Sequence, residues 1–573
     1  MKTTSSSSAK PVKRIQIFDS TLSERTFAVS FSIGEKLSVA SGLDGLGVSF
    51  IESSVSAGNP IEIEYLKQVR SVMKGASQPV VFIPEAVPLT DAASSLKDAQ
   101  SSWIKNVSIR INSWRSHLRE GVSQKKAEPE ANLQDLKKRL IAIRNELSKE
   151  VFLYAEHFFD GFFEDTSYAL SVLETAIECG VNKLILCDSR GGSLPEQVSK
   201  AVKLVDTHFS SSDHLMLGIH CHNDLGLALP NTISAIQAGA TLAQGTINGI
   251  GDRSGSTDLC QLIPVLAYKL GFETVSTHAP RDQQLVTLKA LSDKVSIATG
   301  IFQPQQPFVG SLAFAHTDPN HVVAELQNPE TFEAVNPSLV GNRRLLGVDD
   351  ASIVKSEMSE LGLYTQDGED VAKTVLKRMR ELEAFGCKFE DAKASLHLLI
   401  LESLGYAIWP FQVRRWETST SRSINESSTV VGTIEVSVGA QEGRYEKSLS
   451  ATERGVGPIH AIDLALKKCL EQEFPELRNL KLISYSLNIV DSLSGTAATA
   501  RARTEFSDEV SPSALDASHG SWATTAVSED VLDASIKALI DGYRYKLIFR
   551  SKSVKYTLPD WRVAMSWRYT DRW

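Results

Sequence analysis

The motif His220-Cys221-His222 is the sharpest local signal for chemistry in the sequence. Residues at i and i+2 of a β-strand share a face, so two imidazoles at this spacing can bind one metal ion. Cys221 then points to the opposite face. A lone His-x-His motif is often meaningless, and this one gains weight from the carboxylates that end other predicted strands. The motif predicts a divalent-metal site.

Polar side chains end most of the predicted strands in the first half of the chain. They are Asp19, Glu24, Glu52, Glu85, Asn112, Glu156, Asp188, His220, His222 and Asn248. A β/α barrel gathers its site at this end of its strands. Taken singly, each acid is more commonly a solvated rim residue or a partner that orients a neighbour. Their convergence on one end favours a catalytic interpretation.

Eight short apolar or β-branched runs alternate with stretches of helical periodicity between residues 15 and 270. The runs are 15–22, 48–52, 80–83, 107–111, 151–156, 183–188, 215–222 and 241–250. This alternation requires parallel strands joined by crossover helices. An open doubly wound sheet is the competing fold, but its glycine-rich phosphate turn does not follow the first run. The pattern therefore favours an eight-stranded β/α (TIM) barrel.

The rest of the chain predicts a connector and a small α+β domain. Residues 367–404 look helical, and the serine- and threonine-rich residues 418–428 are a candidate linker. The third unit has predicted strands at 430–438, 482–490 and 497–505 and helices at 458–470 and 530–544. The predicted organisation is a tail at 1–13, a barrel at 14–273, a connector at 274–417, the linker, an α+β domain at 429–550, and a tail at 551–573.

Composition narrows the class of protein. A chain of 573 residues predicts two or three domains, and no apolar run approaches the length of a membrane-spanning helix. The net charge of −9 argues against nucleic acid as a partner. The six cysteines show no paired C-x-x-C spacing, which suits a reducing compartment, and the first ten residues lack a signal peptide's apolar core. These features predict a cytoplasmic protein.

Several longer motifs carry a resemblance to a known family. They are AEHFFDG at 155–161, LCDSRGG at 186–192, HCHNDLGLA at 220–228, QGTINGIGDR at 244–253 and NPET at 328–331. The chain resembles the metal-dependent acyl-CoA condensing barrels, namely isopropylmalate, homocitrate and citramalate synthases, and most closely the longer type of citramalate synthase. Its third unit is similar to the family's C-terminal regulatory dimer domain, through GPIHAID at 457–463, GTAA at 495–498 and WATTAVS at 522–528.

The first strand departs from this family. There it ends in a stretch like DTTLRDGxQ, whose arginine steadies the developing enolate and whose following acid binds the metal. This chain reads DSTLSERTF, with Ser23 in place of the arginine and Glu24 at the ligand position. Loss of one such donor typically costs on the order of 10²–10³ in rate. Arg25 or Arg190, each next to a motif position, is the predicted replacement.

Other positions depart as well. The family's asparagine ligand is Ser256 here, and the threonine of its C-D-T motif is Ser189. The histidine of the connector is retained as His321, whereas the family's tyrosine is Phe332.

The resemblance implies an acyltransferase that condenses acetyl-CoA, or another acyl-CoA, with a 2-oxo acid such as pyruvate or 2-oxoisovalerate. It uses a divalent cation (Mg, Mn or Zn) and is expected to be a homodimer with a possible amino-acid effector at the C-terminal domain. The implied site comprises catalytic Glu156, His321 and Arg25, substrate-binding Asp19, Ser189 and Arg190, and metal-binding Glu24, His220, His222 and Ser256.

Two alternatives stay open at this point. The altered site positions favour a catalytically silent paralogue that serves as a regulatory or partner subunit, whereas the retained ligands oppose it. A carbon–carbon lyase is the other alternative, since related lyases use the same metal barrel, although they lack the C-terminal domain.

Overall fold

The computed structural model describes residues 13–550 with gaps. The gaps are 24–29, 55–59, 100–102, 121–127, 148, 213, 277–278, 281, 317, 319–320, 323, 325–327, 347–350, 362, 364–367, 390–391, 405–408, 423–428, 442–443, 491–497 and 509–520. Glu24, Arg25 and the predicted tails, apart from Lys13, therefore lie outside the described residues. The chain divides into two units, and each is described by itself.

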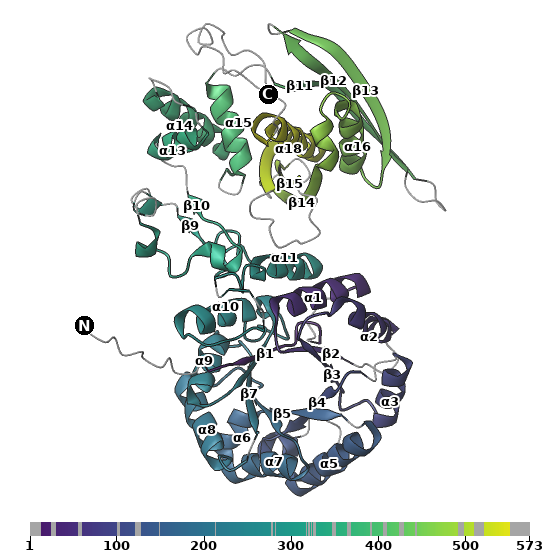
Figure 1. The fold of residues 1–573 in the computed structure, drawn as a ribbon, viewed down its shortest axis with the longest axis vertical. Coiled ribbons are helices and arrows are strands. Elements are labelled where there is room, and N and C mark those ends of the chain that lie inside the picture. Colours follow the sequence, from purple (N-terminus) through teal and green to yellow (C-terminus); the bar gives the residue numbers. More distant parts are fainter. Residues whose placement is uncertain are drawn as a thin grey trace, which may run out of the picture. The chain divides into compact units, whose positions relative to one another are not determined.

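The first unit is built on a closed barrel of eight parallel strands in sequential order, with β8 pairing with β1 (Figure 1). The strands are β1 (Gln16–Asp19), β2 (Phe50–Ser54), β3 (Gln78–Phe82), β4 (Asn106–Asn112), β5 (Glu150–Glu156), β6 (Lys183–Asp188), β7 (Met216–Cys221) and β8 (Leu242–Gly245). All eight predicted strands are present, and the predicted barrel is confirmed. The open doubly wound sheet is wrong, because the pairing of β8 with β1 closes the sheet and leaves it without an edge strand.

Helices surround the ring of strands in Figure 1. The helices of this unit are α1 (Ile33–Leu46), α2 (Pro60–Val72), α3 (Leu89–Asp98), α4 (Arg115–Glu120), α5 (Pro129–Ala142), α6 (Phe158–Glu164), α7 (Thr166–Glu178), α8 (Pro195–His208), α9 (Ala228–Ala238), α10 (Leu259–Pro264) and α11 (Leu288–Thr299), of which α11 packs against α1. α1 shows why such helices begin and end where they do. Ser32 and Glu35 form a capping box at its start, and Gly47 ends it in the left-handed conformation.

The barrel interior has an aromatic floor beneath a polar mouth. Phe152 packs edge-on against Phe18 and Phe50, with ring centroids 5.1 and 4.8 Å apart. Because side chains alternate along each strand, residues two positions further on return to the interior one layer higher. Glu52 and Tyr154 occupy that next layer of β2 and β5. The floor therefore supports the side chains that the strand ends bring to the mouth.

The second unit combines a helical part with two antiparallel three-stranded sheets. Its elements are β9 (Ala315–His316), β10 (Leu345–Leu346), α13 (Ala351–Glu360), α14 (Gly368–Ala384), α15 (Lys393–Ser403), β11 (Phe411–Ser421), β12 (Thr429–Gln441), β13 (Arg444–Gly455), α16 (Pro458–Leu470), β14 (Lys481–Ile489), β15 (Ala500–Ser507), β16 (Ser521–Ser528) and α18 (Val531–Tyr545). α16 packs on β11–β13 and α18 on β15 and β16. The predicted α+β character is confirmed.

The predicted linker at 418–428 needs correction in its first four residues. β11 extends to Ser421 and pairs with β12, with Thr418 opposite Gly432 and Ser421 opposite Thr429. Serine and threonine suggest a linker by composition, yet β-branched threonine suits an exposed strand face. Arg422 follows the strand, and the remaining linker residues, 423–428, lie outside the described residues. The domain boundaries at 273 and 429 stay predictions.

No helix within the described part of the chain is long and apolar enough to cross a membrane.

Candidate functional site

Two histidines from β7 lie together at the mouth of the barrel. His220 is the penultimate residue of β7 and His222 follows its last residue, and their ring centroids are 5.0 Å apart. His220 is 7% exposed, and His222 is half-buried. The Nδ1 atoms of both rings are buried and have no hydrogen-bond partner among the described residues. Orphaned buried nitrogens are uncommon in proteins, and a pair of them fits a shared metal ion.

Burial keeps both imidazoles neutral. It lowers the pKa of His220 well below its usual range, with the nearby charges of His222 and Arg110 acting in the same direction. Burial and the charge of Arg253 lower the pKa of His222. A neutral imidazole keeps the lone pair that a metal ion requires. The two side chains are thus prepared to act as ligands.

Two imidazoles do not complete a metal shell. Across the described residues, no group of three or more histidine, cysteine and acidic side chains is arranged to hold an ion. The predicted third ligand, Glu24, and the predicted catalytic Arg25 lie outside those residues.

Cys221 lies on the opposite side of β7, as the strand geometry requires. It is fully buried in the apolar layer between the barrel and its helices. Burial raises the pKa of its thiol well above the usual range.

Ser256 lies beside His222. The two residues form an antiparallel β-bridge, and the Ser256 hydroxyl lies 3.2 Å from Thr246 Oγ1. Gly255 precedes it with φ +85°, and Asn223 N–H donates to the Gly255 carbonyl. A tight loop therefore holds the strand end that presents His222.

Replacing Gly255 with alanine is expected to weaken metal binding about 10- to 100-fold, the usual effect of disturbing residues that orient metal ligands. An added Cβ would lie 1.9 Å from the Gly249 carbonyl oxygen, so the loop that holds His222 must shift. Titration of metal-free protein with Mn²⁺ measures the affinity. Gly300→Ala is the matched control, because Gly300 is also left-handed, with φ +71°, yet nothing lies within 4 Å of its Cβ position. Equal affinities of the two variants would contradict the assigned role of the loop.

Glu52 forms the centre of a buried hydrogen-bond network below the mouth. The hydroxyls of Ser108 and Tyr154 donate to Glu52 Oε1, and the Ser23 hydroxyl donates to Oε2. Gln244 donates in turn to the Tyr154 oxygen. Burial raises the pKa of Glu52, and the three hydroxyl donors oppose that rise. Ser23, in the turn after β1, thus contacts Glu52 through an uncharged hydroxyl.

Glu156 ends β5 and is paired with an arginine that sequence reasoning missed. Arg110 Nη1 lies 3.4 Å from Glu156 Oε1. The Arg110 guanidinium also lies over the rings of Phe82 and Tyr154, 4.5 and 5.9 Å from their centroids. A charged residue within an otherwise uncharged strand was the available signal for Arg110.

Two of the predicted substrate-binding residues, Asp19 and Ser189, form hydrogen bonds within the turns that follow strands. Asp19 is fully buried, and its two carboxylate oxygens accept hydrogen bonds from the backbone N–H and hydroxyl of Thr21. Burial raises the pKa of Asp19 to about 7. The Ser189 hydroxyl accepts a hydrogen bond from the backbone of His157, so it holds the turn after β5.

Arg190 is exposed and directed to the rim. It pairs with Asp160 at 3.2 Å, and its guanidinium lies 5.5 Å from the Trp114 ring centroid.

A second ion pair missed by sequence reasoning shapes the rim beside His222. Arg253 donates to both carboxylate oxygens of Asp224, at 2.7 and 2.9 Å, and to the Ser189 carbonyl oxygen at 2.9 Å. It therefore ties together the loops that follow β6, β7 and β8. The strand-end acid Asp188 is structural too, since it accepts the backbone N–H groups of Gly192 and Ser193.

His321 belongs to the second unit. It is exposed, and its ring packs on Phe332 with centroids 4.7 Å apart. The predicted approach of His321 to the barrel stays a prediction.

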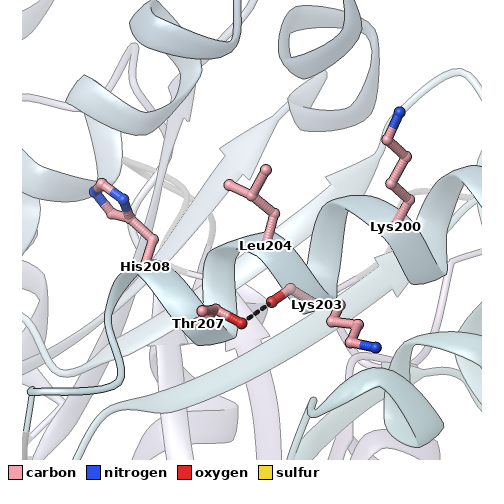
Figure 2. Close-up of a pocket in the computed structure, with 5 residues that line it drawn as sticks. All are labelled: Lys200, Lys203, Leu204, Thr207 and His208. Atoms are coloured by element: carbon pink, nitrogen blue, oxygen red, sulfur yellow. Dashed lines mark hydrogen bonds between the residues drawn. The ribbon is translucent and has the colours of Figure 1, made fainter.

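A shallow depression on the outer face of α8 is separate from these residues. Figure 2 shows its lining, Lys200, Lys203, Leu204, Thr207 and His208, with the Thr207 hydroxyl donating to the Lys203 carbonyl oxygen. It lies on an outer helix and contains neither β7 histidine.

Comparisons with known proteins cover both units. A family model described as HMGL-like matches residues 14–290, and a model described as the LeuA allosteric (dimerisation) domain matches residues 390–547. The chain is 33% identical to a curated (R)-citramalate synthase of Aquifex aeolicus, over 94% of this chain and 98% of the relative. It is 32% identical to an (R)-citramalate synthase of Synechocystis sp., over 93% and 96%. A 2-isopropylmalate synthase of Listeria monocytogenes is 26% identical, over 92% and 96%.

Proposed function

We propose, since the chain belongs to the family of citramalate and 2-isopropylmalate synthases, that it condenses acetyl-CoA with a 2-oxo acid such as pyruvate. The observation that carries this proposal is the likeness to (R)-citramalate synthases, which extends through the barrel and the C-terminal domain. The two β7 histidines at the mouth support it, because their unpartnered nitrogens suit a metal-assisted reaction.

His220 and His222 would hold a divalent ion together with Glu24 and, more weakly, the Ser256 hydroxyl. When bound, Mg²⁺, Mn²⁺ or Zn²⁺ supplies Lewis-acid polarisation of the keto group of the 2-oxo acid. The arrangement of β7 supports this assignment, since both imidazoles lie at one strand end and Ser256 is bridged to His222.

The protein's own residues bind the substrates and move the proton. A base removes a proton from the methyl carbon of acetyl-CoA, and that carbon forms a bond with the keto carbon of the 2-oxo acid. Water then hydrolyses the thioester and releases the CoA thiol. Glu156 would be a catalytic residue that positions the substrate together with Ser189, and His321 would take part in proton transfer. Asp19 and Arg190 are the other proposed substrate-binding residues.

The C-terminal domain would form the dimer and bind an amino-acid effector. The match to an allosteric dimerisation domain supports the dimer. The curated relatives are synthases, and they give no support to a silent paralogue or a carbon–carbon lyase.

Thiol release from acetyl-CoA tests the function directly. With Mg²⁺ or Mn²⁺, the purified chain is expected to release thiol with one member of a panel that includes pyruvate and 2-oxoisovalerate. Chelation should abolish release and renewed metal should restore it, because the keto group is then polarised again. A dimeric, metal-loaded protein that is silent across the panel would contradict the proposal.

A further inference from the structure

Arg110 points into the barrel mouth from β4. Residues 108 and 110 share one face of this strand, and Ser108 is directed inward, since its hydroxyl donates to the buried Glu52. Arg110 therefore occupies the interior layer directly above Ser108. Its guanidinium lies over Phe82 of β3 and Tyr154 of β5, and its side chain is 45% exposed. Its guanidinium therefore packs on the rings of Phe82 and Tyr154 and is partly open to solvent at the mouth.

The mouth that Arg110 faces is rich in acids. Glu52 lies in the layer below it, and Glu156 is paired with it at 3.4 Å. The Arg110 charge helps to lower the pKa of Glu52 against the effect of burial. A 2-oxo acid is an anion, and these acids would repel it unless a cation offsets their charge. Arg110 supplies a cation on the interior face.

The first strand does not offer that cation at the position of the family's arginine. Ser23 stands there, and its hydroxyl makes a neutral hydrogen bond to Glu52. Of the two arginines predicted to replace it, Arg190 is directed to the rim, where it pairs with Asp160, and Arg25 lies outside the described residues. Among the described residues at the mouth, Arg110 of β4 carries a positive charge on the interior face.

We propose that Arg110 binds the carboxylate of the 2-oxo acid substrate in the barrel mouth. A guanidinium has five N–H donors in a planar fork, so it can keep its contact with Glu156 and still donate two parallel hydrogen bonds to a second carboxylate. The rings of Phe82 and Tyr154 fix the plane of the fork before the substrate arrives. This assignment rests on the proposed function for the identity of the substrate, and direct binding of the 2-oxo acid tests it separately.

The test compares Arg110→Met, which keeps an unbranched apolar stem and loses the charge, with Arg110→Lys, which keeps the charge and loses the fork. In Arg110→Met the KM for the 2-oxo acid is expected to rise at least about tenfold, the loss of one charge-assisted carboxylate contact. The KM for acetyl-CoA should change less than about twofold, and Arg110→Lys should fall between Arg110→Met and the parent chain. Calorimetric titration with pyruvate and with 2-oxoisovalerate, without acetyl-CoA, should show the same order of affinities.

Arg70→Met is the matched control, because Arg70 also lies over an aromatic ring, 5.7 Å from the Trp103 centroid, at the C-terminal end of α2. It should leave both KM values unchanged. Equal rises in the two KM values, an unchanged KM for the 2-oxo acid, or no calorimetric binding of either 2-oxo acid to the parent chain would overturn the inference. Should Arg110→Met fail to fold, Arg110→Lys with parental affinity for both acids would overturn it as well. Weakened pyruvate binding in a chain that releases no thiol would uphold Arg110 as a carboxylate-binding residue and reject the condensation.

Discussion

Replacing His220 and His222 together with alanine is expected to remove the bound divalent ion and to lower turnover by on the order of 10³ or more, since Lewis-acid polarisation is worth several kcal/mol and 1.36 kcal/mol corresponds to tenfold in rate. Their Nδ1 atoms are buried without hydrogen-bond partners in the described structure, so the substitution removes no other side-chain contact of those atoms. Elemental analysis of the purified protein measures the metal, and thiol release measures turnover. The loss of two buried rings also leaves space in the mouth, so circular dichroism should accompany both measurements.

His208→Ala is the control, because His208 is an exposed histidine on α8 that pairs only at the surface with Glu174. It should keep the metal and the full rate. Retention of the ion by the double variant would show that the β7 histidines are not ligands. Glu24→Ala extends the experiment to the predicted third ligand, and it is expected to reduce the metal content in the same way.

Replacing His321 with alanine is expected to lower kcat at least about 10²-fold, the usual contribution of a group that transfers a proton in the transition state. The content of bound metal should stay unchanged, because the β7 ligands belong to the other unit. Thiol release at saturating substrate gives kcat, and elemental analysis gives the metal. The separation of these two readouts distinguishes a proton-transfer role from a general loss of the site.

His316→Ala provides the comparison, since His316 lies five residues earlier in β9 of the same unit. Only the His321 variant should lose its rate. A His321→Ala protein with the parental kcat would remove this residue from the mechanism, and the approach of the second unit to the barrel would lose its functional support.

The barrel could be predicted because its strands are buried on both faces and read as apolar runs. β6 was predicted with its observed bounds, and α16 in the second unit was too. The β8 prediction extended to residue 250, whereas the strand ends at Gly245. A short helical turn follows at Ile247–Gly249, in which Asn248 takes φ +64°. Apolar residues continue through that turn, so the pattern alone did not show the end of the strand.

The positions of site residues could be predicted where the alternation of side chains along one strand determines them. Contacts between side chains of different strands or loops could not be predicted. Spacing alone placed His220 and His222 on one side of β7. Arg110 could not be predicted from its own strand, because it lies two residues before the end of β4 and its place depends on rings from the two neighbouring strands. The pairing of Arg253 with Asp224 depends on loops far apart in the sequence, which no local pattern reveals.

The orientation of Cys221 has a consequence for which metals the mouth can select. Thiolate is the soft ligand that draws copper(I) and iron–sulfur chemistry, and only the deprotonated sulfur binds. Here the sulfur faces the apolar layer behind the strand, and burial raises the pKa of its thiol well above the usual range. The sulfur that lies between the two imidazoles in the sequence is thus directed away from them. The end of β7 itself therefore presents imidazole nitrogens to the mouth, and imidazole suits the borderline divalent ions.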